Sequence, residues 1–296
     1  MNIRKGSILI VVAAVLWALD GIVRRSLYSL PPLVIVSVEH LVGSILILPF
    51  IFKGIQKERF NKKEWLALGA ISLFSGLLGT LWFTTALLMT NYISFSVVFL
   101  LQKLQPIFAL LAARILLKEK LSKEYVFWAV CALIAAFLVT FPTGSVNLNT
   151  GDKTLQAAVF ALGAAVVWGA STALSRYVLL KHNDRVVSGM RFFITTLLSF
   201  IALLLFGQLM LVKSVTPIQL GQFIFIAVST GMVALLLYYK GLKSTPVRVS
   251  TLLELTFPLL AIGVDYFLYN TVISPIQIVS GAILLFSLYN VSKKTI

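Results

Sequence analysis

The chain has 296 residues, of which 59% are hydrophobic and 12% charged, and its mean hydropathy is +0.98. These values leave too few polar side chains to cover a water-soluble globule of this length. The formal net charge is +15, but the basic residues are spread over short loops instead of gathering on one folded face with aromatic residues. We therefore expect an integral membrane protein that has no nucleic-acid partner.

Ten apolar runs follow one another along the chain, and continuous runs of about 20 residues indicate membrane helices rather than barrel strands. The expected spans of the first half cover residues 6–28, 32–52, 64–89, 92–117 and 124–141, and those of the second half cover residues 154–180, 185–212, 217–242, 246–269 and 275–291. We predict an all-α integral membrane fold of ten transmembrane helices.

The two halves repeat the same order of motifs. Span 1 contains Ala14-Val15-Leu16-Trp17-Ala18, which returns in span 6 as Ala165-Val166-Val167-Trp168-Gly169. Leu104-Gln105-Pro106-Ile107 in span 4 has its counterpart in Thr256-Phe257-Pro258-Leu259 of span 9. The predicted repeats are residues 1–142 and 154–296. Because each has an odd number of spans, the second repeat would be inverted relative to the first, which is the arrangement that permits alternating access in secondary transporters. A static bundle built by duplication is the alternative.

The Lys and Arg residues predict the orientation of the spans. If both termini lie on one side, that side collects most of the 25 basic residues, whereas the opposite side has Arg24, Arg25, Lys153 and Lys213. The positive-inside rule then places both termini in the cytoplasm. We expect a multi-pass protein of the cell membrane, plasma or inner, surrounded by membrane lipid and present as a monomer or homodimer.

Few residues in the chain could serve metal or nucleotide chemistry. Cys131 is the only cysteine, and His40 and His182 are the only histidines, so a disulfide or a zinc or di-metal centre is not expected. The chain also has no Gly-x-x-x-x-Gly-Lys-Ser/Thr motif. We predict no cofactor, and we expect the energy for transport to come from a gradient or from substrate exchange.

The end of span 4 carries the most family-specific sequence of the chain. Residues 105–122 have a Pro followed by small and Leu residues, then Glu119 and Leu121-Ser122 before span 5. Together with the repeated Trp and the matched basic positions His40 and Arg191, this stretch resembles the drug/metabolite transporter superfamily, EamA-type. The resemblance covers essentially the whole chain and implies transport of amino acids, other small metabolites, drugs or sugar conjugates. The second copy departs from the pattern, because Thr271 occupies the position that matches Glu119.

Charged and aromatic residues inside the expected spans predict the substrate site, because a charge within the bilayer is costly unless it faces a partner or water. Trp17 and Trp168 recur at matched depth, and we expect them to line a pocket, with general packing as the alternative. Asp20 and Arg24 share the helix face of Trp17. Asp20 would contact substrate, unless Asp20 and Arg24 form a purely structural pair.

Spans 4 and 9 place polar residues near the middle of the membrane. The repeat puts Glu254 opposite Gln102, and a Pro frees the carbonyl four residues back, so Pro106 and Pro258 add an unpaired carbonyl to each span. Lys103 and Glu254 could bind the carboxylate and ammonium groups of a zwitterion, or they could pair with each other.

Span 2 carries Glu39 and His40. Glu39 is the leading proton-coupling candidate, because burial favours the neutral form of a carboxyl group. A structural Glu39 neutralised by Lys103 or Arg24 is the alternative. His40 ordinarily titrates near neutral pH, but its match to Arg191 equally suits a structural or gating role.

The complete predicted site combines these residues with aromatic residues of the two hairpins. The residues expected to bind substrate are Trp17, Asp20, Trp82, Gln102, Lys103, Trp168, Tyr238, Tyr239 and Glu254; those for proton coupling are Glu39 and His40; and those for gating or structure are Arg24, Pro106, Arg191 and Pro258. No catalytic residue or metal ligand is predicted.

The function that these features favour is secondary active transport of a small-molecule substrate by alternating access. An amino acid or a related zwitterionic or amphipathic metabolite is the expected substrate, with export favoured and proton coupling as a hypothesis. A transporter of nucleotide sugars or drug-like cations is the first alternative. An integral-membrane lipid-modifying enzyme and a channel or assembly partner are further ones.

Overall fold

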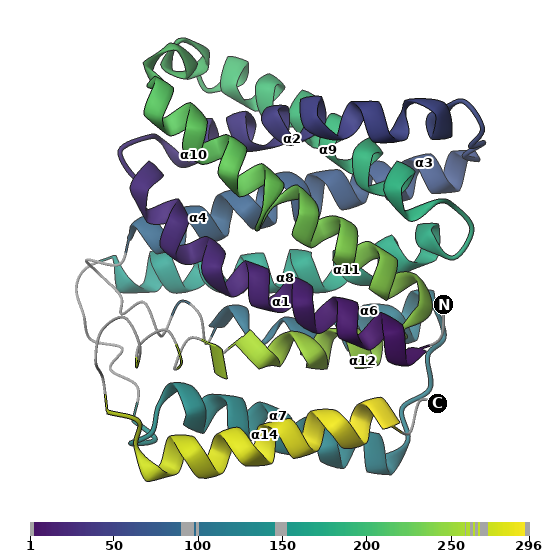
Figure 1. Cartoon of the computed structure of the whole chain (residues 1–296), viewed down its shortest axis with the longest axis vertical. Coiled ribbons are helices and arrows are strands. Elements are labelled where there is room, and N and C mark those ends of the chain that lie inside the picture. Colours follow the sequence, from purple (N-terminus) through teal and green to yellow (C-terminus); the bar gives the residue numbers. More distant parts are fainter. Residues whose placement is uncertain are drawn as a thin grey trace.

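The computed structural model describes residues 3–89, 98, 101–145, 153–257, 259–260, 263, 266 and 272–293. All regular elements among these residues are helical (Figure 1). In chain order they are α1 (Ile3–Arg24), η1 (Arg25–Leu27), α2 (Pro32–Ile55), α3 (Lys62–Ile71), η2 (Ser72–Gly79), α4 (Thr80–Leu88), α6 (Gln105–Leu116), α7 (Lys123–Thr140), α8 (Thr154–Leu179), α9 (Asp184–Leu205), η3 (Leu209–Ser214), α10 (Pro217–Val228), α11 (Met232–Ser244), α12 (Val247–Leu253), η4 (Glu254–Thr256) and α14 (Pro275–Lys293).

Seven helical segments are long and apolar enough to cross a membrane. They are Pro32–Ile55, Lys62–Leu88, Lys123–Thr140, Leu155–Leu179, Asp184–Leu205, Pro217–Ser244 and Pro275–Lys293. The first expected span corresponds to α1, which has 22 residues. The fourth and ninth expected spans fall partly on positions 92–97, 99–100, 258, 261–262, 264–265 and 267–269, outside the described residues, and Thr271 lies outside them too. The count of ten spans therefore stays a prediction.

Polar residues just before the apolar runs start several of these helices. Asn61 accepts a hydrogen bond from the Glu64 N–H, and the Glu64 side chain accepts one from the Asn61 N–H, which makes a capping box at α3. Thr216 and Gln219 form the same motif at α10. Ser122 caps α7 by accepting from the Tyr125 N–H. Because backbone groups cannot bind water inside a bilayer, such caps mark where each span enters it.

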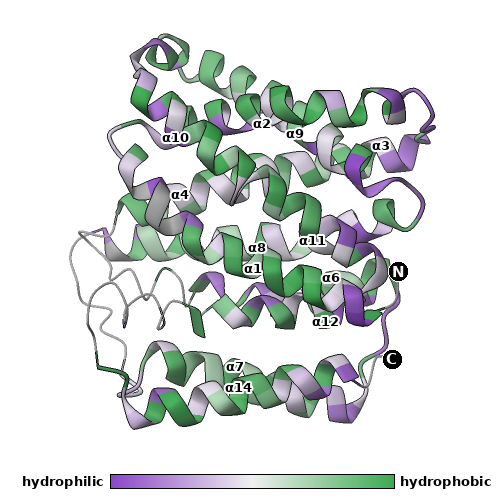
Figure 2. Ribbon diagram, viewed as in Figure 1, coloured by the Kyte–Doolittle hydropathy of each residue, from purple (hydrophilic) through white to green (hydrophobic). Residues whose placement is uncertain are grey.

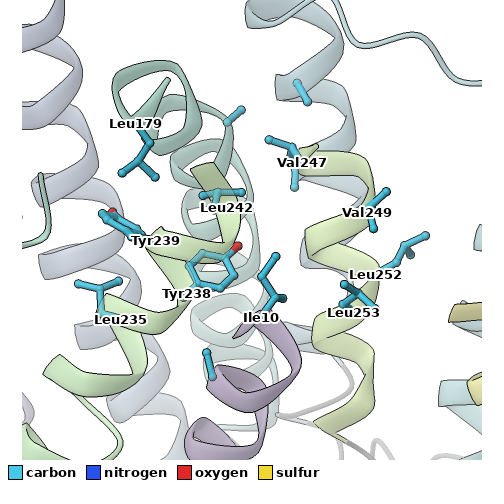
Figure 3. Packing of buried hydrophobic residues seen from close by; sticks show 14 of the residues in the cluster. Ile10, Leu179, Leu235, Tyr238, Tyr239, Leu242, Val247, Val249, Leu252 and Leu253 are labelled. Carbon is cyan, nitrogen blue, oxygen red and sulfur yellow. The ribbon is translucent and has the colours of Figure 1, made fainter. Parts of the chain in front are cut away.

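The main helix pairs each join the first half of the chain to the second. α1 packs on α11, α2 on α9, α6 on α8 and α7 on α14, as can be followed in Figure 1. Figure 3 shows part of the core, where Tyr238 of α11 lies near Ile10 of α1. Packing of this kind puts the shared space of the bundle between the two halves.

The first residues of α1 and the last of α14 lie on the same side of the molecule (Figure 1). A hydrogen bond of 3.2 Å joins Ser292 of α14 to Ser7 of α1 there. We call this the terminal side. Figure 2 shows hydrophobic residues along the helices and hydrophilic ones mostly at their ends, with a concentration on the terminal side. This distribution suits a bundle whose middle faces lipid.

The predicted orientation can be tested at two exposed positions. Ser145 follows α7 and Gln56 follows α2, and both are exposed. If the termini are cytoplasmic, a cysteine replacing Ser145 in a Cys131→Ser background should react with a membrane-impermeant thiol reagent in intact cells. A cysteine replacing Gln56 should react only after the cells are opened. The opposite pattern would place the termini outside.

Candidate substrate-binding cavity

A cavity of about 200 Å³ lies inside the bundle and is lined by both halves of the chain. Its walls come from α1, α2, η2, α4 and α6 of the first half, and from α8, α9, α11 and η4 of the second half. The predicted site residues that line it are Trp17, Asp20, Arg24, Glu39, His40, Gln102, Lys103, Trp168, Arg191, Tyr238, Tyr239 and Glu254. Residues far apart in the sequence therefore meet around one space.

Three predicted residues do not belong to the described lining. Trp82 packs against α8 instead, where a Cβ on Gly163 would lie 2.9 Å from its ring, and Phe83 lines the cavity in its place. The π-helical turns of η2 precede α4, and the wider turns shift the residues that follow to a different face from the one a regular α-helix gives. Pro106 lies buried in the first turn of α6, and Pro258 lies outside the described residues.

Asp20, Arg24 and Glu39 form a buried ionic cluster. Arg24 donates from Nη1 and Nη2 to the two carboxylate oxygens of Glu39, at 2.8 and 3.1 Å, and from Nε to Asp20 Oδ2 at 2.7 Å. Arg24 is 5% exposed and Glu39 6%. The second oxygen of Asp20 accepts from Thr230 Oγ1 at 2.5 Å. The contacts match two alternatives considered from the sequence, namely a structural Asp20–Arg24 pair and a Glu39 that is neutralised by Arg24.

Glu254 lies in a different environment, because its hydrogen-bond donors are neutral. Tyr238 donates its hydroxyl to Oε1 at 2.7 Å, and Gln105 donates its amide to Oε2 at 3.0 Å. Gln102 in turn donates to Gln105 Oε1 at 2.9 Å. Lys103 Nζ lies 4.1 Å from the centre of the Phe257 ring, and no Lys103–Glu254 ion pair is present among the described residues. The midplane salt bridge considered from the sequence is therefore not formed in this structure.

Two aromatic pairs contribute to the lining. The rings of Trp17 and Tyr238 are 5.0 Å apart, and those of Trp168 and Phe83 are 5.2 Å apart. In each pair the Trp belongs to one half of the chain and its partner to the other. The two repeated Trp residues thus meet equivalent hairpins of the opposite half, which is the relation that a duplicated unit predicts.

His40 and Arg191 add further polar groups to the lining. His40 Nδ1 hydrogen-bonds to the Val36 carbonyl at 2.9 Å, and its ring lies 5.4 Å from that of Phe192. Arg191 donates to Ser75 Oγ at 2.7 Å, with its guanidinium 5.7 Å from the Tyr239 ring. Arg191 belongs to α9, which packs on α2, so these two matched positions lie on paired helices of the two halves.

Matched hairpin helices lose regular α-helical geometry beside the cavity. In the first half η2 is a π-helix, and its Ser75 carbonyl accepts from Trp168 Nε1 at 3.1 Å. In the second half the span Pro217–Ser244 is interrupted between Val228 and Met232, where Thr230 reaches Asp20. Irregular backbone inside a membrane is tolerated where it lines a cavity. Sequence reasoning missed these residues, although Ser and Thr in the middle of both spans were a usable signal.

Polar contacts between the halves also gather on the terminal side. Glu119 accepts the backbone N–H groups of Val247 and Arg248 at 2.9 and 3.1 Å, at the start of α12, and its carboxylate lies 3.7 Å from Arg176 Nε. A carboxylate at a helix N-terminus satisfies donors that have no partner within the helix. Glu119, the acidic residue of the span 4 motif, thus joins the two halves.

A second contact on this side joins the loop after α2 to the loop after α8. Glu58 lies 2.6 Å from His182 Nδ1 and accepts the Asn183 N–H at 2.9 Å. Burial alone raises the pKa of the Glu58 carboxyl, but the hydrogen bonds from His182 and Asn183 outweigh it and hold that pKa below its ordinary value. Lys181 adds an ion pair to Glu64 at 3.0 Å.

Comparison with known proteins places this arrangement in a family. The model of the EamA-like transporter family matches residues 4–141 and again residues 155–293. The chain is 35% identical to the riboflavin transporter ImpX of Fusobacterium nucleatum subsp. nucleatum, over 99% of both chains. It is 23% identical to an uncharacterized transporter of Clostridium kluyveri, over 96% of this chain and 94% of the relative.

A third relative and a solved structure extend the comparison. Protein LicB of Haemophilus influenzae is 25% identical over 93% of this chain and 92% of its own length. A crystal structure with 18% sequence identity has a TM-score of 0.76 and covers 99% of this chain and 98% of that chain, which shows a shared fold. The chain therefore belongs to the EamA-like transporter family and is a multi-pass membrane transporter of a small molecule, not an enzyme.

Proposed function

We propose that this protein carries riboflavin, or a metabolite with the same flat aromatic and hydrogen-bonding chemistry, across the cell membrane by alternating access through its central cavity. The observation that carries the proposal is the cavity itself, which combines aromatic walls with neutral amide groups. The relative named as a riboflavin transporter supports the same substrate, because it is similar to this chain over nearly its whole length.

The chemistry of a flavin suits these walls. Its fused ring offers a flat aromatic face and carbonyl acceptors, and its side chain offers hydroxyl groups. The Trp17–Tyr238 and Trp168–Phe83 pairs provide aromatic surface, and Gln102 provides a neutral amide in the lining. In the cluster of Asp20, Arg24 and Glu39 the guanidinium donates hydrogen bonds to both carboxylates, so these charged groups already have partners within the protein.

The proposed cycle uses the two halves as inverted repeats, residues 1–142 and 154–296, with both termini in the cytoplasm. Support comes from the helix pairs that join the halves and from the cavity between them. Exchanging the conformations of the two repeats would then move the opening of the cavity from one side of the membrane to the other.

An amino acid is the second candidate substrate. The observation that favours it is the presence of Lys103 and Glu254 in one cavity without an ion pair between them. These groups could receive the carboxylate and the ammonium group of a zwitterion. A flavin would need neither charge, so the two candidates differ in how strongly transport should depend on Lys103.

The test is uptake of riboflavin by proteoliposomes that contain the purified protein, with flavin mononucleotide and amino acids as competitors. Trp17→Ala and Trp168→Ala should each lower riboflavin uptake at least about tenfold, which corresponds to about 1.4 kcal/mol, because each removes an aromatic wall. Trp65→Ala is the matched control, since Trp65 is 46% exposed on α3 and does not line the cavity. Counterflow of an amino acid without riboflavin uptake would overturn the proposal in favour of the second candidate.

A further inference from the structure

We infer that Glu254 is the carboxyl group that binds and releases a proton during transport. This inference rests on the proposed transport function and concerns the coupling of transport through the same cavity to proton movement. It replaces the expectation that Glu39 does so. The inference depends on how the two carboxyl groups are paired, how far they can reach cavity water, and which charged groups surround them.

Glu39 is held as a permanent partner of Arg24. Two hydrogen bonds join the carboxylate to one guanidinium in a fork geometry, and this pairing favours the ionised carboxylate. With 6% exposure, Glu39 also has little access to water in the cavity. A proton bound there would leave Arg24 with a weaker partner in a buried site, so Glu39 is poorly suited to load and release one.

Glu254 has the opposite properties. Both of its oxygens accept hydrogen bonds, but the donors are the neutral Tyr238 and Gln105. Burying an ionised carboxylate among neutral groups is costly, and binding a proton removes that cost. The Glu254 side chain is only partly buried and lines the cavity, so protons can reach it from whichever side the cavity is open to.

The groups around Glu254 come from each element packed against η4, namely α1, α7 and α12, and from the cavity wall. Lys103 also lines the cavity. Its positive charge opposes protonation of Glu254, although the two side chains form no ion pair among the described residues. On α1 the carboxylate of Asp20 is already paired with Arg24. The titratable and charged groups near Glu254 are Lys103 and Tyr238 in the cavity, Asp20 and Arg24 on α1, Tyr125 on α7 and Arg248 on α12. The Tyr125 hydroxyl donates a hydrogen bond to the Arg248 carbonyl.

The position of Glu254 also links its charge to substrate contacts. Tyr238 donates to Glu254 and at the same time packs against Trp17 of α1, in the opposite half. A proton that arrives from bulk water on the open side would neutralise Glu254 and weaken the hold of the carboxylate on the Tyr238 hydroxyl. The packing of the aromatic wall would therefore depend on whether Glu254 is protonated. Release of the proton on the other side would restore the original hydrogen bond from Tyr238.

The first experiment needs no substrate. Infrared difference spectra of the wild-type protein between mildly acidic and mildly alkaline pH should contain the carbonyl stretch of a buried protonated carboxyl group. Glu254→Gln should lack this band, and Glu124→Gln, which changes an exposed carboxyl group on α7 that does not line the cavity, should retain it. A wild-type protein without the band, or a band that survives in Glu254→Gln, would overturn the inference.

The second experiment measures transport in proteoliposomes. Glu254→Asp, which keeps a carboxyl group, should retain stimulation of riboflavin uptake by a pH gradient, whereas Glu254→Gln should lose it, since an amide cannot bind and release the proton. Full gradient-driven uptake in Glu254→Gln would contradict the inference. If riboflavin is not transported at all but the infrared band depends on Glu254, the proposed substrate is wrong and the proton site stands.

Discussion

Arg24→Met should lower the free energy of unfolding of the purified protein by about 3–5 kcal/mol, the loss typical of removing one partner from a buried ion pair. The variant leaves two carboxylates without their cation, because Arg24 contacts both Asp20 and Glu39. Denaturant titration followed by tryptophan fluorescence would measure the change. The effect is large because Arg24 and Glu39 are both nearly fully buried.

A double variant separates stranded charge from lost packing. Arg24→Met combined with Glu39→Gln removes one of the two stranded carboxylates, so it should be more stable than Arg24→Met alone. Arg185→Met provides a control for loss of a basic residue at an exposed position, where changes are usually within about 0.5 kcal/mol. Equal losses in Arg24→Met and Arg185→Met would show that the cluster does not stabilise the fold.

The features that the sequence predicted correctly follow from the apolar environment of the bilayer and from the motifs that both halves of the chain share. Apolar runs predict membrane helices because unsatisfied backbone groups are excluded from the bilayer, and seven of the expected segments are present as such helices. Trp17 and Trp168 were found by comparing the two halves with each other, and both line the cavity. A motif that appears twice marks equivalent positions, whatever the details of packing.

The pairing of charged residues could not be predicted in the same way. Glu39 and Arg24 are 15 residues apart, and whether they meet depends on the loop between α1 and α2 and on the rotation of both helices. From the sequence, Arg24 and Lys103 were equal candidates to neutralise Glu39. Trp82 lies outside the described lining for a related reason, because the π-helix that precedes it leaves Phe83 to line the cavity instead.

The last prediction concerns the contact between α6 and α8, which joins the two halves beside the cavity. A Cβ on Gly169 of α8 would lie 2.8 Å from the Gln105 carbonyl oxygen and 2.8 Å from the Ala109 nitrogen. These are backbone atoms of α6, so they cannot rotate away as a side chain can. Gly169→Ala should therefore push the helices apart and cost about 1–3 kcal/mol of stability, as overpacking of a close contact does.

Transport should fall as well, because Gln105 carries the amide that reaches Glu254, and a displaced α6 would lengthen that hydrogen bond. The matched control is Gly221→Ala on α10, where nothing lies within 4 Å of the added Cβ. In that position Ala should be neutral or stabilising, since Ala favours a helix over Gly by about 1 kcal/mol. Unfolding and riboflavin uptake measured side by side decide the matter: if Gly169→Ala behaves like Gly221→Ala in both, the close approach of α6 and α8 is not required for either stability or transport.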